Sequence, residues 1–343
     1  MRSTTMGVAA LAALTMICPP ALADYMVKEV GSFHVGGRTA ELSGMPTKDV
    51  VFSPGMPAIK VDPNGEFAVE QMYVQYVKLA QPKAKVPLLL WHGGGLTGVT
   101  WETKPDGAPG WQQYFVRAGH PVYVSDAVER GRASWAPYQE VFAGTPFLRT
   151  KREAWELFRI GAPGSYAADP ARRAALPGSK FPLAAFDRFA MQFVPRWASN
   201  DAATQRAYDG LVQQVGDCVL IVHSQSGNFG LRAALAAPDK VKGVIALEPS
   251  GAPPPGPALA ALKDVPVLIV WGDFVETNPI WRHQQPASRA FADDLAARGG
   301  RVEWLDLPAR GIAGNSHMIM MDTNSDAIAA LVQDWMTRHG LMA

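Results

Sequence analysis

The stretch VLIVHSQSGNF, at positions 219–229, carries an apolar run into a small polar cluster, after which a helical pattern begins. Several aliphatic residues in succession are typical of a strand that is buried on both faces of a sheet. Comparable apolar runs recur along the chain, and helical patterns lie between them. This alternation predicts an α/β fold with a mostly parallel central sheet and helices on both faces. The further runs lie at 72–77, 86–91, 121–125, 241–247, 265–271 and 302–305, and the helical patterns at 111–118, 228–236, 286–298 and 326–339.

The composition is that of a globular protein with a substantial core. The chain has 343 residues, of which 48% are hydrophobic and 18% are charged, and its formal net charge is +1. Lysine and arginine are scattered along the chain rather than clustered. The sequence therefore favours neither a nucleic acid nor a membrane surface as a partner.

The N-terminus has the pattern of a secretory signal peptide over residues 1–23. Arg2 supplies the positive start, an apolar run covers 6–18, and the tripeptide at 21–23 matches the small-x-small cleavage pattern. We expect cleavage after Ala23 and a mature chain that is periplasmic or secreted. A short membrane anchor is the alternative, but the apolar run falls short of the ~20 residues that a span needs. We expect no membrane span in the mature chain.

Residues 127–205 interrupt the alternation with many prolines and aromatics and no clear strand. We interpret them as a cap inserted into one domain that spans 24–343, because excursions of this length are usually functional. Phe186, Phe189 and Phe193 have the spacing of one helix face. That face either packs on the core or, together with Trp197, walls a substrate pocket; we expect Phe189 and Trp197 to line the pocket.

The polar cluster SQSGN, at 224–228, stands where a buried strand turns into a helix. In serine hydrolases such a turn presents the nucleophile, with small residues two positions before and after it. Around Ser226 these positions hold Ser224 and Asn228, whereas around Ser224 the first would hold the larger Val222. We therefore predict Ser226 as the nucleophile; an ordinary strand–helix turn is the alternative.

A glycine-rich loop, in LLLWHGGGLTG at 88–98, follows another buried strand. A serine hydrolase needs backbone N–H groups aimed at the oxyanion of its tetrahedral intermediate. We expect one donor to be the N–H of Gly94 or Gly95, and the other that of Gly227, which follows the predicted nucleophile. A phosphate-binding loop is excluded, because the stretch lacks the required lysine and its spacing.

His317, in GIAGNSH at 311–317, is the predicted base, because it follows the last predicted strand and precedes the C-terminal helix. Two carboxylates could orient its ring. Glu248 ends one strand pattern and Asp273 ends the next. Position in the chain favours Asp273 slightly and leaves Glu248 open.

The chain resembles a small family of secreted bacterial α/β-hydrolase esterases over most of its length after residue 23. HSQSG and GNSHM are the most specific motifs of this resemblance. It implies an α/β-hydrolase fold, with Ser226 as nucleophile, His317 as base and Glu248, rather than Asp273, as acid. The segments that carry the resemblance are HGGGLTGVTWETKPDGAPGW (92–111), VYVSDAVERGRASW (122–135), HSQSG (223–227), VIALEP (244–249) and GIAGNSHMIMMD (311–322).

These observations predict a secreted serine carboxylic-ester hydrolase that acts on a small-molecule ester through an acyl-enzyme, without metal or other cofactor. The same triad could hydrolyse an amide, a lactone or a carbon–carbon bond, and a non-catalytic homologue that only binds a ligand is a further alternative. Some relatives have two adjacent cysteines where this chain has Gly94 and Gly95, so a cysteine pair has no role here. We expect no nucleic-acid partner, and a homodimer is the one assembly that we consider.

Overall fold

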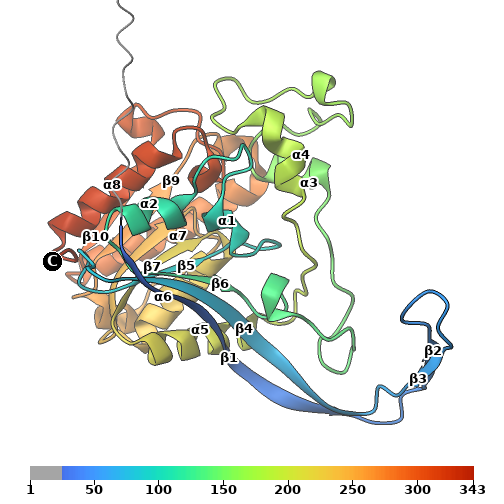
Figure 1. Cartoon of the computed structure of the whole chain (residues 1–343). Coiled ribbons are helices and arrows are strands. Elements are labelled where there is room, and N and C mark those ends of the chain that lie inside the picture. Colours follow the sequence, from blue (N-terminus) through green and yellow to red (C-terminus); the bar gives the residue numbers. More distant parts are fainter. Residues whose placement is uncertain (1–24) are drawn as a thin grey trace, which may run out of the picture.

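The computed structural model describes residues 25–343, and the predicted signal peptide lies outside them (Figure 1). An eight-stranded sheet forms the centre of the molecule, in the order β1-β4-β6-β5-β7-β8-β9-β10. The neighbours from β6 to β10 are parallel, and β4 is antiparallel to both β1 and β6. The mostly parallel sheet predicted from the apolar runs is therefore confirmed. The strands are β1 (Val27–Leu42), β4 (Gly65–Leu79), β5 (Leu88–Trp91), β6 (Val122–Asp126), β7 (Cys218–His223), β8 (Val241–Leu247), β9 (Val267–Trp271) and β10 (Val302–Asp306).

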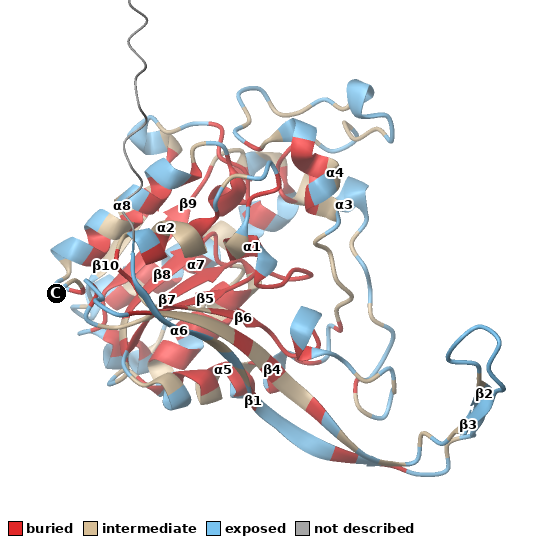
Figure 2. Ribbon diagram, in the orientation of Figure 1, coloured by how far each residue is buried: buried red, intermediate tan, exposed pale blue. Residues whose placement is uncertain are grey.

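Helices cover both faces of the sheet, which leaves the central strands buried (Figure 2). Leu89 and Trp91 of β5 pack with the helices of one face, while Leu88 and Leu90 pack with those of the other, as the alternation of side chains along a strand requires. The first face carries α5 (Asp201–Val215), α6 (Gln225–Ala236) and α7 (Pro279–Ala297), and the second carries α1 (Val99–Glu102), α2 (Trp111–Arg117) and α8 (Ser325–Arg338).

The helix predicted at 286–298 begins earlier, at Pro279. The side chain of Asn278 accepts the N–H of Ile280 and so caps the helix, and a proline at the first helical position loses no hydrogen bond. Pro286 then lies inside the helix rather than at its start.

Residues 127–200 form a long excursion between β6 and α5, and residues 201–205 already belong to α5. The excursion contains only short helices, the longest being α3 (Lys151–Leu157) and α4 (Phe186–Ala190). The remaining short helical turns of the chain are η1 (Gly131–Ala133), η2 (Pro170–Arg172), η3 (Leu183–Ala185), η4 (Pro257–Leu262), η5 (Val275–Thr277), η6 (Pro308–Arg310) and η7 (Ile319–Met321).

The cap aromatics that we expected to line a pocket are core residues instead. Phe189 is fully buried and packs edge-on against Phe193 and Phe181. Trp197 packs on Phe142, and its indole N–H donates to the carbonyl of Gly144. The prediction that Phe189 and Trp197 wall a substrate pocket is wrong, because both rings are buried among other core side chains. Their burial stabilises the cap itself.

The strands β1 and β4 extend beyond the sheet as a two-stranded arm (Figure 1). Its tip holds the short hairpin of β2 (Lys48–Val50) and β3 (Ile59–Val61). Within residues 25–343, no helix combines the length and the apolar character that crossing a membrane requires.

Candidate active site

Ser224 occupies the sharp turn between β7 and α6, at the carboxyl end of the sheet. Its backbone angles, φ 54° and ψ −117°, lie in a region that residues other than glycine rarely adopt. Strain of this kind persists only where the surrounding structure imposes it, and functional sites are where it gathers. In hydrolases the strained strand-to-helix turn is the position of the nucleophilic serine.

Ser226, the predicted nucleophile, lies within the first turn of α6 and faces the main chain. Its hydroxyl donates to the carbonyl of Trp91 at 2.7 Å and accepts the N–H of His223 at 2.9 Å. These bonds tie α6 to β5 and β7, and they engage the hydroxyl with the main chain. This geometry argues against Ser226 as the nucleophile, since a nucleophile must face its base.

The size of Val222 was the argument against Ser224, and α6 removes that objection. A Cβ placed on Gly230 would lie only 2.7 Å from Cγ1 of Val222. The glycine that lets this turn close therefore stands on the helix rather than two positions before the serine.

His317 and Glu248 form a buried pair beside this turn. Nδ1 of His317 lies 2.6 Å from Oε2 of Glu248, and neither side chain is exposed. The backbone N–H of His317 donates to the carbonyl of Phe158, and its ring packs on Phe158 and Trp281, with centroids 5.5 and 3.9 Å away. Nε2 of His317 has no hydrogen-bond partner among the described residues. That nitrogen is therefore available to take a proton.

The charges of the pair are set by burial and by one arginine from the cap. Burial alone would raise the pKa of Glu248, but the charges of Arg159 and His317 outweigh it and lower that pKa to about 2. Arg159 is itself fully buried and forms an ion pair with Oε1 of Glu248, which also accepts the N–H of Gly272 at 2.7 Å. Burial lowers the pKa of His317 to about 4, against the opposing effect of Glu248. The acid is thus charged and the base neutral at ordinary pH.

A small cavity of about 100 Å³ lies at Ser224. Ser224 lines it together with Phe158 and Trp281, the two rings that hold His317. The full lining is Gly93, Gly94, Leu96, Arg149, Leu157, Phe158, Arg196, His223, Ser224, Ser250, Ile280 and Trp281.

Comparison with known proteins shows which group of enzymes the chain belongs to. No family model matches the chain. The structure described as “a Novel Bacterial Esterase” is 33% identical, with a TM-score of 0.78, and the match covers 92% of this chain and 98% of that one.

The chain belongs to the esterase and lipase group of the α/β-hydrolases. It is a carboxylic-ester hydrolase. The “Probable secreted lipase phiG” of a fungal species (strain ATCC 74256) is also similar, at 27% identity over 334 residues, which cover 80% of this chain and 88% of the relative.

The glycine loop of this esterase follows β5 and reaches the cavity through Gly93 and Gly94. Gly227 does not fit its predicted part in the oxyanion hole, because its N–H donates to the carbonyl of Ser224 at 2.9 Å. The residue after Ser224 is Gln225, the first of α6, and a first-turn N–H has no acceptor within its own helix. Gly95 adopts φ +74°, and its carbonyl accepts the N–H of Val194 from the cap.

Asp273, the alternative acid, braces loops instead of orienting the base. Its carboxylate accepts the N–H groups of Phe274 and Gly314, at 2.7 and 2.8 Å. Its carbonyl accepts Nε of Arg159 at 2.7 Å. The acid implied by the family resemblance, Glu248, is the one that contacts the base.

Some residues that support the site were missed in the sequence. Asp322 accepts the N–H and the hydroxyl of Ser316 and the amide of Asn315, so it fixes the loop that presents His317. The only signal for Asp322 was its place at the end of the segment GIAGNSHMIMMD (311–322). Nothing in the sequence pointed to Arg159, which comes from the cap.

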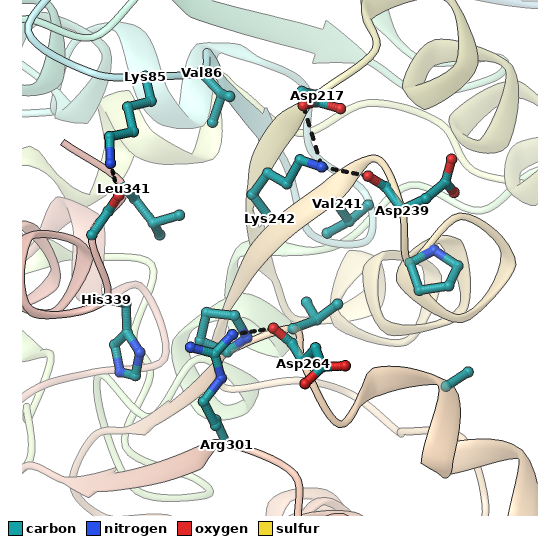
Figure 3. A pocket seen from close by; sticks show the side chains of 15 residues that line it. Lys85, Val86, Asp217, Asp239, Val241, Lys242, Asp264, Arg301, His339 and Leu341 are labelled. Carbon is teal, nitrogen blue, oxygen red and sulfur yellow. Dashed lines mark hydrogen bonds and ion pairs between the residues drawn. The ribbon is translucent and has the colours of Figure 1, made fainter. Parts of the chain in front are cut away.

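A wider hollow of about 740 Å³ lies at the amino ends of the strands, away from the site (Figure 3). Its lysines already have partners: Nζ of Lys242 lies 3.2 Å from Asp217, and Nζ of Lys85 donates to the carbonyl of Gly340. None of the residues that line it is a serine or a cysteine. The size of this hollow therefore does not make it the reaction site.

Proposed function

We propose that Ser224, His317 and Glu248 form the catalytic triad of this carboxylic-ester hydrolase. The observation that carries the proposal is the strained backbone of Ser224 at the end of β7, in the same cavity as the rings that hold His317. The order of the three residues along the chain, serine, acid and then histidine, is the usual one for this fold.

In the proposed reaction, Oγ of Ser224 attacks the acyl carbonyl of the ester while Nε2 of His317 takes its proton. The N–H groups of Gln225 and Gly94 donate to the oxyanion of the tetrahedral intermediate. His317 then returns the proton to the leaving alcohol, which frees the acyl-enzyme. Water, deprotonated by the same nitrogen, hydrolyses that intermediate and releases the acid.

Glu248 keeps the ring of His317 in the tautomer that leaves Nε2 unprotonated before attack, and it stabilises the imidazolium that forms. The cavity of about 100 Å³ favours a small ester over a long acyl chain. The similarity to a relative named as secreted supports the proposal that residues 1–23 are a signal peptide cleaved after Ala23. Mass analysis of the mature N-terminus tests that point, and a chain that still begins at Met1 would contradict it.

The test of the triad compares Ser224→Ala with Ser226→Ala on a panel of p-nitrophenyl esters of increasing acyl length. We expect Ser224→Ala to abolish turnover and labelling by an organophosphorus serine probe, because the residues of a triad act as a unit. Ser226→Ala should stay labelled and active but lose stability, by about 1–3 kcal/mol for the unmet main-chain partners. Loss of labelling in Ser226→Ala alone would refute the assignment.

A further inference from the structure

The cavity at Ser224 is lined by two arginines, Arg149 and Arg196, and no aspartate or glutamate lines it. Both come from the cap, and both reach over the glycine loop. A Cβ placed on Gly94 would lie 2.5 Å from Nη1 of Arg196, and one on Gly95 would lie 3.7 Å from Nε of Arg149. Two positive charges therefore stand next to the glycines that face the scissile carbonyl.

The protein leaves part of this charge unmatched. The side chain of Arg149 is 7% exposed, and among the described residues its one ion pair is with Glu153, whose side chain is 45% exposed. Within residues 25–343, Arg196 makes no ion pair, and Nε of both arginines is buried without a hydrogen-bond partner. Burying a guanidinium is costly unless it is paired and hydrogen-bonded.

The surroundings add positive charge rather than removing it. Arg130 lies nearby, paired with the buried carboxylate of Glu129. Burial, together with the charge of Arg130, lowers the pKa of both Arg149 and Arg196. Two carboxylates oppose this effect on Arg196: the exposed Asp201, which accepts the amide of Gln225, and Glu129.

A purely structural role accounts for only part of these contacts. Arg149 lies over the ring of Phe158 at 5.2 Å, and Arg196 over that of Phe147 at 5.6 Å. Such stacking supports the cap, but it does not use the N–H donors, which lie in the plane of each guanidinium. Both arginines line the cavity at Ser224, and each has an Nε–H donor without a hydrogen-bond partner among the described residues. Such a pair of donors fits an anionic ligand.

We propose that the substrate is an ester that carries a carboxylate near its scissile bond, and that Arg149 and Arg196 bind this carboxylate. The proposal rests on the proposed function of Ser224. The planar fork of a guanidinium matches the two oxygens of a carboxylate, and such charge-assisted bonds are stronger than neutral ones. The arginines thereby select acidic esters and place their carbonyl over the glycine loop.

The experiment uses pairs of esters that differ only in a carboxylate or the amide of the same shape. Monoethyl glutarate and ethyl 4-carbamoylbutanoate place the group on the acyl side. Acetoxyacetate and acetoxyacetamide place it on the alcohol side. With acid release measured at constant pH, we expect the wild-type enzyme to prefer the anionic member of at least one pair by about 10- to 100-fold in kcat/KM.

Arg196→Met and Arg149→Met should bring that preference close to one, mainly through KM, and Arg196→Lys should keep part of it. The matched control is Arg152→Met, an exposed arginine on the same helix as Glu153, which should keep the wild-type preference. Where a methionine variant fails to fold, the wild-type ratio and the lysine variant still decide.

Two results would overturn the proposal and leave the triad intact. One is equal turnover of both members of each pair by wild-type enzyme that Ser224→Ala inactivates. The other is an equal loss for anionic and neutral esters in the methionine variants, which would place the arginines in the oxyanion hole or the cap structure. An enzyme that hydrolyses none of the four esters, nor the p-nitrophenyl esters, would instead refute the proposed function.

Discussion

The buried contact between His317 and Glu248 decides which nitrogen of the base takes the proton. Because Nδ1 lies 2.6 Å from the carboxylate, Nε2 is left as the free nitrogen. Phe158 and Trp281 both pack on the ring of His317, and Asp322 fixes the loop that carries it. The chemistry of single residues here depends on neighbours that come from distant parts of the chain.

Glu248→Gln should lower kcat by about 10²- to 10⁴-fold, since an amide does not hold the imidazole tautomer or stabilise the imidazolium. Asp273→Asn makes the same change in a carboxylate that only braces loops, so it should affect stability more than kcat. Steady-state kinetics on p-nitrophenyl acetate compares the two. If Asp273→Asn proves the more damaging, Asp273 is the acid.

The pH profile should extend to unusually acid conditions. His317 acts as a base only when neutral, and its lowered pKa of about 4 moves the acid limb of kcat/KM below the ordinary value of 6.5. Glu248, with its pKa at about 2, stays charged throughout that range. We expect kcat/KM to be level from about pH 5 to pH 8 and to fall with a midpoint near 4.

The same shift affects stability with a defined sign. Because the folded form favours neutral His317, the folding stability that this histidine contributes is fully present above pH 6.5. It is lost as the pH falls through about 4. Circular dichroism at each pH separates unfolding from titration of the base. An acid limb centred at 6.5 or higher in folded protein would contradict the expected profile.

At the scale of elements, the site is built by one turn and by the end of one short helix. The turn from β7 into α6 presents Ser224, and Gly230 of α6 gives Val222 the room that this turn needs. The end of α3 carries Phe158 and then Arg159, which adopts φ 55°. The cap therefore supplies the ring and the charge that complete the histidine–glutamate pair.

Arg159→Met should reduce kcat and move the acid limb of the profile to higher pH. Without the guanidinium, burial favours protonated Glu248, and the pKa of His317 rises too because the charge of Arg159 lowers it. Breaking a buried pair should also cost about 3–5 kcal/mol of stability. Arg159→Lys keeps the positive charge, so it should retain part of the wild-type kcat and part of the stability.

The matched control is Arg173→Met, which removes another buried cap guanidinium, one that pairs with the partly exposed Asp187. It should leave the acid limb where it is. An unchanged profile in Arg159→Met would show that Arg159 only fills space.

At the scale of the whole molecule, the site lies at the carboxyl ends of the central strands, where the strand order reverses around β5. The cap adds to this edge, whereas the arm of β1 and β4 extends away from the body (Figure 1). The expected homodimer stays a prediction. The arm ends in exposed apolar side chains, among them Phe52 and Met56.

Replacing residues 46–63 by a short glycine linker should leave kcat/KM unchanged. Where the tip joins the arm, the backbone N–H and carbonyl of Met45 already bond the side-chain amide of Asn64. A short linker can therefore close the arm there. The tip buries little surface, and Tm should change by only a few degrees. Kinetics and thermal unfolding measure the two effects; lost activity would give the tip a part in catalysis.

Sequence by itself determined the fold class, and it predicted the glycine loop and the base of the proposed site. Buried parallel strands need unbroken apolar runs, and such runs at 86–91 and 241–247 are local properties of the chain. His317 was predicted as the base because the last loop of this fold carries that residue. Glu248 came only from the family resemblance, since position along the chain favoured Asp273.

Only the tertiary structure favours Ser224 over Ser226. Both serines stand between the same strand and helix, but Ser224 has the strained backbone of the turn and the hydroxyl of Ser226 is bonded to the main chain. Gly230, on the facing turn of α6, leaves room for Val222, whose size had argued against Ser224. Arg159 reaches Glu248 from another segment, with a sequence separation of 89 residues. Periodicity reports which face of an element is apolar, and it carries no information about which distant side chain will meet that face.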